Sequence, residues 1–141
     1  MDPTDVMQDV NRKLKRIESI LNSDKRAEAG KHFRAGVDLG TSDIVVVVLD
    51  GKGEPVAAFM EWAEVVRDGV VLDYWQAATI VTNLLRAAEQ KLNIKIEEVI
   101  TSFPPGTDPQ ISENVIKAAG RNVRYLIDEP SSVACLLDMS A

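Results

Sequence analysis

The spacing of hydrophobic positions changes along the chain, and its first segment predicts a single helix. Residues 3–22 carry apolar side chains at helical spacing, which indicates an amphipathic helix with a basic opposite face. The expected apolar stripe comprises Val6, Met7, Val10, Leu14, Ile17, Ile20 and Leu21. Asp2 can cap this helix and Pro3 can begin it, because proline at the first helical position gives up no hydrogen bond. Residues 25–34 are polar and are expected to form a linker.

The next part of the chain has the apolar spacing and the valine content of strands. We predict strands over 35–39, 44–49 and 54–61. The turns between them, at 40–43 and 50–53, are short, so the three strands are expected to run antiparallel. Residues 65–73 predict a small ribbon that turns at Asp68-Gly69.

The remainder of the chain alternates helices and strands. Helices are expected over 74–92, 109–119 and 130–137, and strands over 98–103 and 125–128. A helix between two strands makes them join a sheet in parallel. The order β-β-β-α-β-α-β-α therefore predicts an α/β fold with a mixed five-stranded sheet, preceded by the N-terminal helix. Trp62, Trp75 and Cys135 are expected to be packing residues, and His32 is expected to be solvated.

The charge divides the chain at the same place as the spacing. Of a net charge of −6 over 141 residues, residues 1–34 carry +2 and residues 35–141 carry −8, which predicts two modules with these bounds. An acidic main body makes nucleic acid an unsuitable partner. No apolar run reaches the ~18 residues of a membrane span. One cysteine and no secretory signal favour a reducing compartment, so we expect a cytoplasmic protein.

The first candidate site is the turn between the first two predicted strands. Asp38 ends the first strand and can hold magnesium through water. Gly40 lacks the Cβ that would block a phosphate, and backbone N–H groups of a small-residue turn can wrap one. Thr41 and Ser42 add hydroxyl donors. The same pattern also occurs in ordinary turns, so both interpretations stay open.

A second carboxylate pair leaves the last predicted strand. Asp128-Glu129 precedes Pro130, and the ends of parallel strands line one crevice, so Glu129 is expected near Asp38. Glu129 can there bind a hydrated metal or orient an attacking water, although helix capping is an alternative role. A two-metal nuclease would need a fuller carboxylate cluster than Glu89 could complete, so this activity is set aside.

These motifs resemble those of known families. The element order is that of the ribonuclease H-like fold, and residues 36–41 with 128–130 resemble two motifs of the actin-like/heat-shock-chaperone ATPase superfamily. Residues 61–71 and 101–109 resemble the EutJ family of ethanolamine-utilisation proteins, chaperone-like proteins encoded beside bacterial microcompartment genes. The resemblance covers about residues 35–138.

The resemblance implies ATP and Mg as cofactors of an ATPase. It makes Asp38 and Glu129 catalytic, with Asp38 holding Mg through water, and makes Gly40, Thr41 and Ser42 nucleotide-binding residues. The superfamily's second phosphate motif and second lobe have no counterpart in this sequence. We therefore expect a truncated N-terminal lobe that binds ATP weakly or not at all, and whether the chain is an enzyme stays open.

The partners that the resemblance implies are ethanolamine-utilisation proteins or microcompartment components. The face that a second lobe would cover is expected to be exposed in this chain, so we expect that the chain self-associates or folds its N-terminal helix over that face. The alternative function is a non-catalytic scaffold or cargo-docking module for a bacterial microcompartment, with residues 3–22 as a helical tag.

Overall fold

A computed structural model describes residues 2–40, 42–64, 66–67, 70–71, 73–103 and 108–128. Its helices are α1 (Pro3–Ile20), α2 (Tyr74–Leu92) and α3 (Pro109–Ala118). Its strands are β1 (Arg34–Leu39), β2 (Asp43–Leu49), β3 (Pro55–Trp62), β4 (Val66–Arg67), β5 (Val70–Val71), β6 (Glu98–Phe103) and β7 (Asn122–Asp128). The predicted terminal helix at 130–137 and Cys135 lie outside the described residues.

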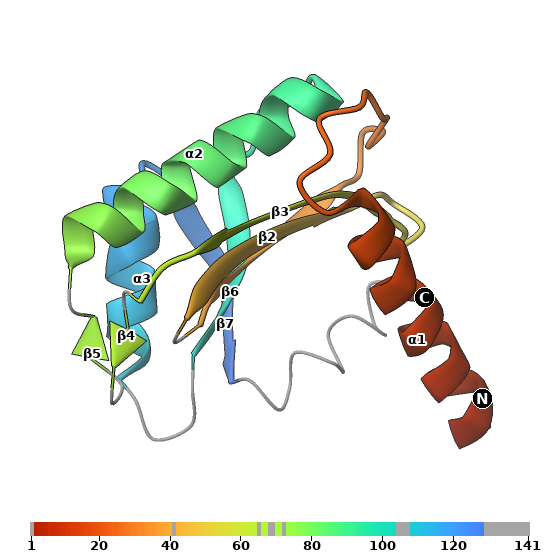
Figure 1. Cartoon of the computed structure of the whole chain (residues 1–141), viewed down its shortest axis with the longest axis horizontal. Coiled ribbons are helices and arrows are strands. Elements are labelled where there is room, and N and C mark those ends of the chain that lie inside the picture. The colour runs from red at the N-terminus through yellow and green to blue at the C-terminus, as the bar shows by residue number, and fades with distance from the viewer. Residues whose placement is uncertain are drawn as a thin grey trace.

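Five strands form a mixed sheet in the order β3-β2-β1-β6-β7, as the element order predicts (Figure 1). β1, β2 and β3 pair antiparallel, whereas β6 pairs parallel with both β1 and β7. Strands β4 and β5 pair antiparallel as a separate two-stranded ribbon, which confirms the predicted small ribbon. The central position of β1 matters for function, because it carries the first candidate site.

The main core lies between one face of the sheet and helices α2 and α3. Alternate strand residues point into it, among them Val37 and Leu39 of β1 and Val46 of β2. They meet the apolar stripe of α2, including Val81 and Leu85, which are fully buried. Because side chains alternate along a strand, the neighbours of these residues face the other side of the sheet.

Strand β7 begins three residues earlier than the apolar pattern predicts. Parallel pairing with β6 starts at Asn122, which lies opposite Glu98, and the Asn122 N–H donates to the Glu97 carbonyl at 2.9 Å. Backbone hydrogen bonds thus recruit polar residues that hydrophobic spacing does not mark as a strand.

Helix α1 buries or half-buries most of the predicted stripe, but it adds Lys13 and leaves two members of the stripe exposed. Val10, Lys13 and Ile20 are buried, whereas Met7 and Leu14, both placed in the predicted stripe, are 56% and 47% exposed. Lys13 faces inward with its Nζ 3.5 Å from Asp9 Oδ2. The contact face of α1 therefore includes Lys13, whose Nζ is buried with the rest of the side chain and has no hydrogen-bond partner among the described residues.

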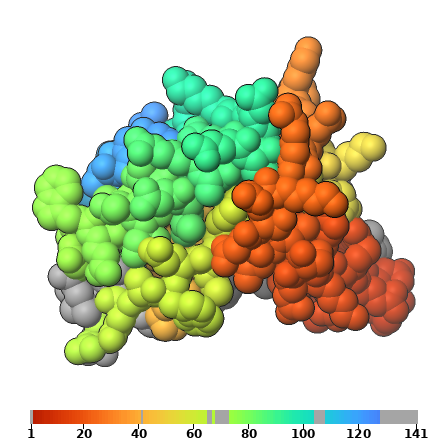
Figure 2. Space-filling model, turned by 45° about the horizontal axis from the view of Figure 1, so that its top comes forward, coloured from red at the N-terminus to blue at the C-terminus, as the bar shows by residue number. Residues whose placement is uncertain are grey.

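Residues after α1 cover the open edge of β3. Leu21 forms a parallel bridge with Ala58, and Asn22 donates its N–H to the Ala58 carbonyl at 2.8 Å. The side chain of Asn22 then accepts from the Met60 N–H at 2.8 Å. The predicted linker is also partly structural, because Ala29 is buried in the main core. Figure 2 shows this red and orange N-terminal segment packed against the body of the molecule.

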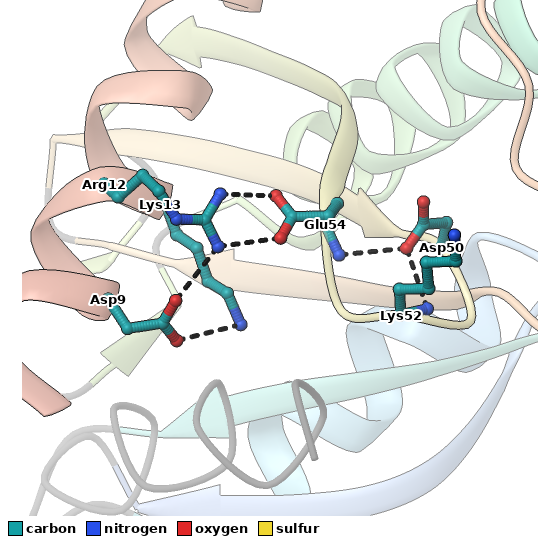
Figure 3. Close-up of polar contacts among 6 residues, drawn as sticks. All are labelled: Asp9, Arg12, Lys13, Asp50, Lys52 and Glu54. Atoms are coloured by element: carbon teal, nitrogen blue, oxygen red, sulfur yellow. Dashed lines mark hydrogen bonds and ion pairs between the residues drawn. The ribbon is translucent and has the colours of Figure 1, made fainter. Parts of the chain in front are cut away.

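An ionic contact ties α1 to the turn between β2 and β3. Arg12 donates to both oxygens of Glu54, at 2.8 and 2.7 Å, and also to Asp9 at 2.9 Å (Figure 3). Asp50 holds the turn by accepting from the backbone N–H groups of Lys52 and Glu54.

The expectation that both tryptophans are packing residues is wrong. Trp62 is 70% exposed because it ends the edge strand β3, and Trp75 is 81% exposed in the first turn of α2. His32 is exposed as expected. None of the helices in the described part of the chain is both long and apolar enough to cross a membrane.

Candidate functional site

The candidate site lies where β1 leaves the middle of the sheet. Asp38 is exposed, and it lies opposite Val45 on one side and Ser102 on the other. Its neighbours Val37 and Leu39 are buried in the main core, so the Asp38 carboxylate projects from the opposite face. Strand alternation thus places an acid on the sheet face that α2 does not cover.

The turn after β1 is closed by Gly40 and Asp43. The Gly40 N–H donates to the Asp43 carbonyl at 2.9 Å. A Cβ at Gly40 would lie 2.7 Å from Asp43 Oδ1 and 3.0 Å from the Asp43 carbonyl oxygen, so the close approach requires glycine. Ser42 is exposed at the tip, and its carbonyl accepts from the Ala63 N–H at 3.0 Å. Thr41 lies outside the described residues.

Sequence reasoning missed Ser102 as a site residue. Ser102 Oγ donates to Asp38 Oδ1 at 2.9 Å, and Ser102 is only 8% exposed. The sequence does show a serine near the end of a strand that is predicted to be parallel to others, which could have marked Ser102 as a candidate. The sequence does not show the register between β1 and β6, which places Ser102 beside Asp38.

The second acid of the predicted site, Glu129, lies outside the described residues. The backbone of Asp128, which precedes it, is opposite Phe103 at the end of β6. Ser102, the neighbour of Phe103, lies opposite Asp38. The C-terminal ends of the parallel strands β1, β6 and β7 therefore lie side by side at the same end of the sheet. The ends of β1 and β7 are two strand spacings apart, which is roughly 10 Å. The proximity of Glu129 to Asp38 stays a prediction.

The electrostatics of the turn favour a cation. Asp38 and Asp43 flank Gly40, and no Lys or Arg among the described residues forms an ion pair with either acid. No group of three or more His, Cys, Asp or Glu in the described part of the chain could enclose a metal. The oxygen donors present suit Mg²⁺, which commonly keeps several waters and needs few carboxylates.

Glu89, considered above for a nuclease, has a structural role near the C-terminal end of α2. Its Oε1 accepts from Arg121 and its Oε2 accepts from the Ile96 N–H, at 2.9 and 2.8 Å. These contacts join α2 to the segments that precede β6 and β7. Both carboxylate oxygens of Glu89 thus accept hydrogen bonds at the N-terminal ends of β6 and β7, away from the candidate site.

Comparison with known proteins finds close relatives. The chain is 52% identical over 102 residues to the ethanolamine utilization protein EutJ of Salmonella typhimurium, which covers 72% of this chain. It is 51% identical over 104 residues to the EutJ protein of Escherichia coli K12, covering 74% of this chain. No protein-family model matches the sequence.

A solved structure agrees with these relatives. The crystal structure of EutJ from Carboxydothermus hydrogenoformans matches 94% of this chain with a TM-score of 0.82 and 36% identity. The resemblance to EutJ proteins, based on residues 61–71 and 101–109, is thereby confirmed, and the strand order confirms the predicted ribonuclease H-like α/β fold with a mixed five-stranded sheet. The chain spans 37% of the length of the two curated relatives and 49% of the crystallised one.

Proposed function

We propose that this chain, which is related to the EutJ ethanolamine-utilisation proteins and has the fold of an actin-like ATPase lobe, is the N-terminal nucleotide-binding lobe of a EutJ-like chaperone ATPase. The observation that carries the proposal is the exposed Asp38 at the end of the central strand, followed at once by the closed Gly40 turn. We further propose that the protein acts in the cytoplasm on ethanolamine-utilisation proteins or microcompartment components.

The charge of the turn defines which form of the nucleotide it takes. A bare triphosphate would be repelled by Asp38 and Asp43, whereas a cation between these acids and the phosphates reverses the interaction. Asp38 would hold Mg²⁺ through water, and the Ser42 hydroxyl and backbone N–H would face the phosphates, because the Gly40 N–H already donates to the Asp43 carbonyl. The bound Mg²⁺ would neutralise phosphate charge. The lobe should therefore recognise Mg-ATP and not free ATP.

The proposed ATPase reaction belongs to the longer protein in which such a lobe faces a second one. Closing two lobes around a nucleotide excludes water and completes a catalytic set of residues. In that arrangement we assign Glu129 to orienting the attacking water. One lobe supplies only part of the contacts, so we expect an affinity of about 1 mM, equivalent to roughly −4 kcal/mol.

A titration of this chain with Mg-ATP, followed by amide NMR shifts, tests the proposal. Shifts are expected at Gly40, Ser42 and Ser102, and they should disappear when EDTA removes the metal. Asp38→Asn keeps the size of the side chain but removes the charge, and should abolish the shifts. Asp50→Asn is the matched control, because Asp50 occupies the turn between β2 and β3, where its side chain accepts from the backbone N–H groups of Lys52 and Glu54.

Two results would contradict the proposed function. One is the absence of any response at about 10 mM Mg-ATP both in this chain and in a longer, two-lobed EutJ protein. The other is an equal response of the Asp38→Asn variant and the unmodified chain. Either would favour the non-catalytic scaffold.

A further inference from the structure

We propose that Ser102 is a positioning residue, whose hydroxyl holds the Asp38 carboxylate in the one orientation that receives a hydrated cation. This inference rests on the proposed function for its consequence, but the geometry that it asserts can be measured without a nucleotide. Ser102 Oγ lies 2.9 Å from Asp38 Oδ1, across the parallel pair β1 and β6.

The contact joins a buried donor to an exposed acceptor. Ser102 is 8% exposed, whereas Asp38 is exposed on the sheet face away from α2. An exposed aspartate is free to exchange rotamers unless a contact restrains it. A hydrogen bond to a charged acceptor is among the stronger ones that a side chain makes. With Oδ1 held by Ser102, the rotamer is fixed and Oδ2 is left as the oxygen for metal-bound water.

The donor is itself held from two sides. Its strand is paired with β1 and β7, and its carbonyl accepts from Ser112 Oγ of α3 at 3.3 Å. Groups that orient a functional side chain work best on rigid elements with their own supporting contacts. Ser102 meets this requirement.

The adjacent hydroxyl provides a contrast within the same strand. Thr101 is also buried, and its Oγ1 donates to the Val37 backbone carbonyl at 2.9 Å. This bond strengthens the β1–β6 pairing but touches no site residue. Thr101 therefore bonds to the backbone of β1, whereas Ser102 bonds to the side chain of Asp38. The Ser102 bond is for this reason not part of the backbone pairing between β1 and β6.

The first experiment measures the Asp38 rotamer directly, by three-bond couplings to its carboxylate carbon in the unliganded chain. We expect a single rotamer in the unmodified protein, rotamer averaging in Ser102→Ala, and a single rotamer again in Ser102→Thr, which restores a hydroxyl. Thr101→Val should lower stability and leave the rotamer fixed. An averaged Asp38 in the unmodified chain, or a fixed one in Ser102→Ala, would overturn the proposal.

The second experiment measures the consequence, by titrating each variant with ATP at several Mg²⁺ concentrations. Ser102→Ala should need about fivefold to tenfold more Mg²⁺ for half-maximal response, while Ser102→Thr and Thr101→Val should match the unmodified chain. An unchanged Mg²⁺ requirement in Ser102→Ala refutes the positioning role and leaves the proposed function intact. If no variant responds to Mg-ATP, the proposed function fails, and the rotamer measurement still decides the role of Ser102.

Discussion

Asn22 offers the sharpest test of how the N-terminal helix is attached to the sheet. It lies two residues beyond α1, in the left-handed region with φ = 56°. Its backbone N–H donates to the Ala58 carbonyl, and its side-chain oxygen accepts from the Met60 N–H, both at 2.8 Å. One residue thus satisfies two outward-facing backbone groups of the edge strand β3, which would otherwise be open to another chain.

Two separable terms set the size of the effect at Asn22. A residue with a Cβ is disfavoured in the left-handed region by roughly 1–2 kcal/mol, and asparagine is among the few that tolerate it. The side-chain hydrogen bond is exposed to water, so its net contribution is about 0.5–1 kcal/mol. Asn22→Ala incurs the backbone penalty and also loses the hydrogen bond, which together destabilise the attachment by about 2 kcal/mol. Asn22→Gly keeps the backbone conformation and loses only the hydrogen bond, about 1 kcal/mol.

Hydrogen exchange of the Met60 amide reports this attachment, because it follows local opening as well as global unfolding. Relative to the unmodified chain, exchange should be about fivefold faster in Asn22→Gly and roughly thirtyfold faster in Asn22→Ala. Asn22→Asp keeps an acceptor and a residue type that tolerates the left-handed region, so its exchange should stay within about twofold.

Two outcomes would refute this account of Asn22. Equal exchange in the Gly and Ala variants would show that backbone conformation contributes nothing. Unchanged exchange in both would show that Asn22 does not protect the edge. Light scattering adds an independent check, because an uncovered β3 edge should promote dimers in Asn22→Ala.

Three further predictions concern the Gly40 turn, the buried Lys91 and the Arg12–Glu54 ion pair. Gly40→Ala should lower the melting temperature by several degrees, because its Cβ would clash with Asp43, and the double variant with Asp43→Ala should recover part of the loss in thermal melts. Burial lowers the pKa of Lys91 below its ordinary 10.5, so the Lys91→Met variant should have a higher melting temperature than the unmodified chain at pH 7. This difference in melting temperature should shrink toward pH 10.5, because Lys91 of the unfolded chain then also loses its charge. A difference that stays constant with pH would contradict this prediction. Arg12 lowers the pKa of Glu54 below its ordinary 4.5, so the ion pair stabilises the docking of α1 above that pH. This contribution is lost as the pH falls through the pKa of Glu54 in the folded chain. Amide hydrogen exchange of α1 should therefore accelerate at acid pH in the unmodified chain, and this acid-dependent step should be missing in Arg12→Met.

Local signals in the sequence were sufficient for most of the fold. Turn residues and crossover helices determine which strands are antiparallel and which are parallel, and α2 and β6 have the predicted bounds. The face of α1 was harder to predict, because the helix packs on Lys13 and leaves Leu14 exposed. Hydrophobic spacing cannot identify a Lys whose aliphatic stem is buried. The exposure of Trp62 was missed for a related reason, since hydrophobic composition does not show that the end of an edge strand lies in solvent.

The candidate site was predictable where it depends on neighbouring residues and not where it depends on register. Asp38 and Gly40 are adjacent in sequence, so a strand followed by a tight turn places both. Ser102 is separated from Asp38 by 64 positions, and their contact requires the register between β1 and β6. A shift of one residue in that register would bring Thr101 or Phe103 opposite Asp38 instead.

The length of the β2–β3 hairpin separates the site from the ionic contact between α1 and Glu54. Asp43 pairs with Trp62 at the end of the hairpin beside the Gly40 turn, while Glu54 receives Arg12 at the opposite end. The β2–β3 pairing lies between these two ends, with its one register irregularity at Val48 and Leu49 near the Glu54 end, so loss of the Arg12–Glu54 contact should not change the geometry at Asp38. Arg12→Met should therefore leave the Mg²⁺ requirement for ATP unchanged. This makes it a control for Ser102→Ala, and an altered requirement would instead couple α1 to the nucleotide.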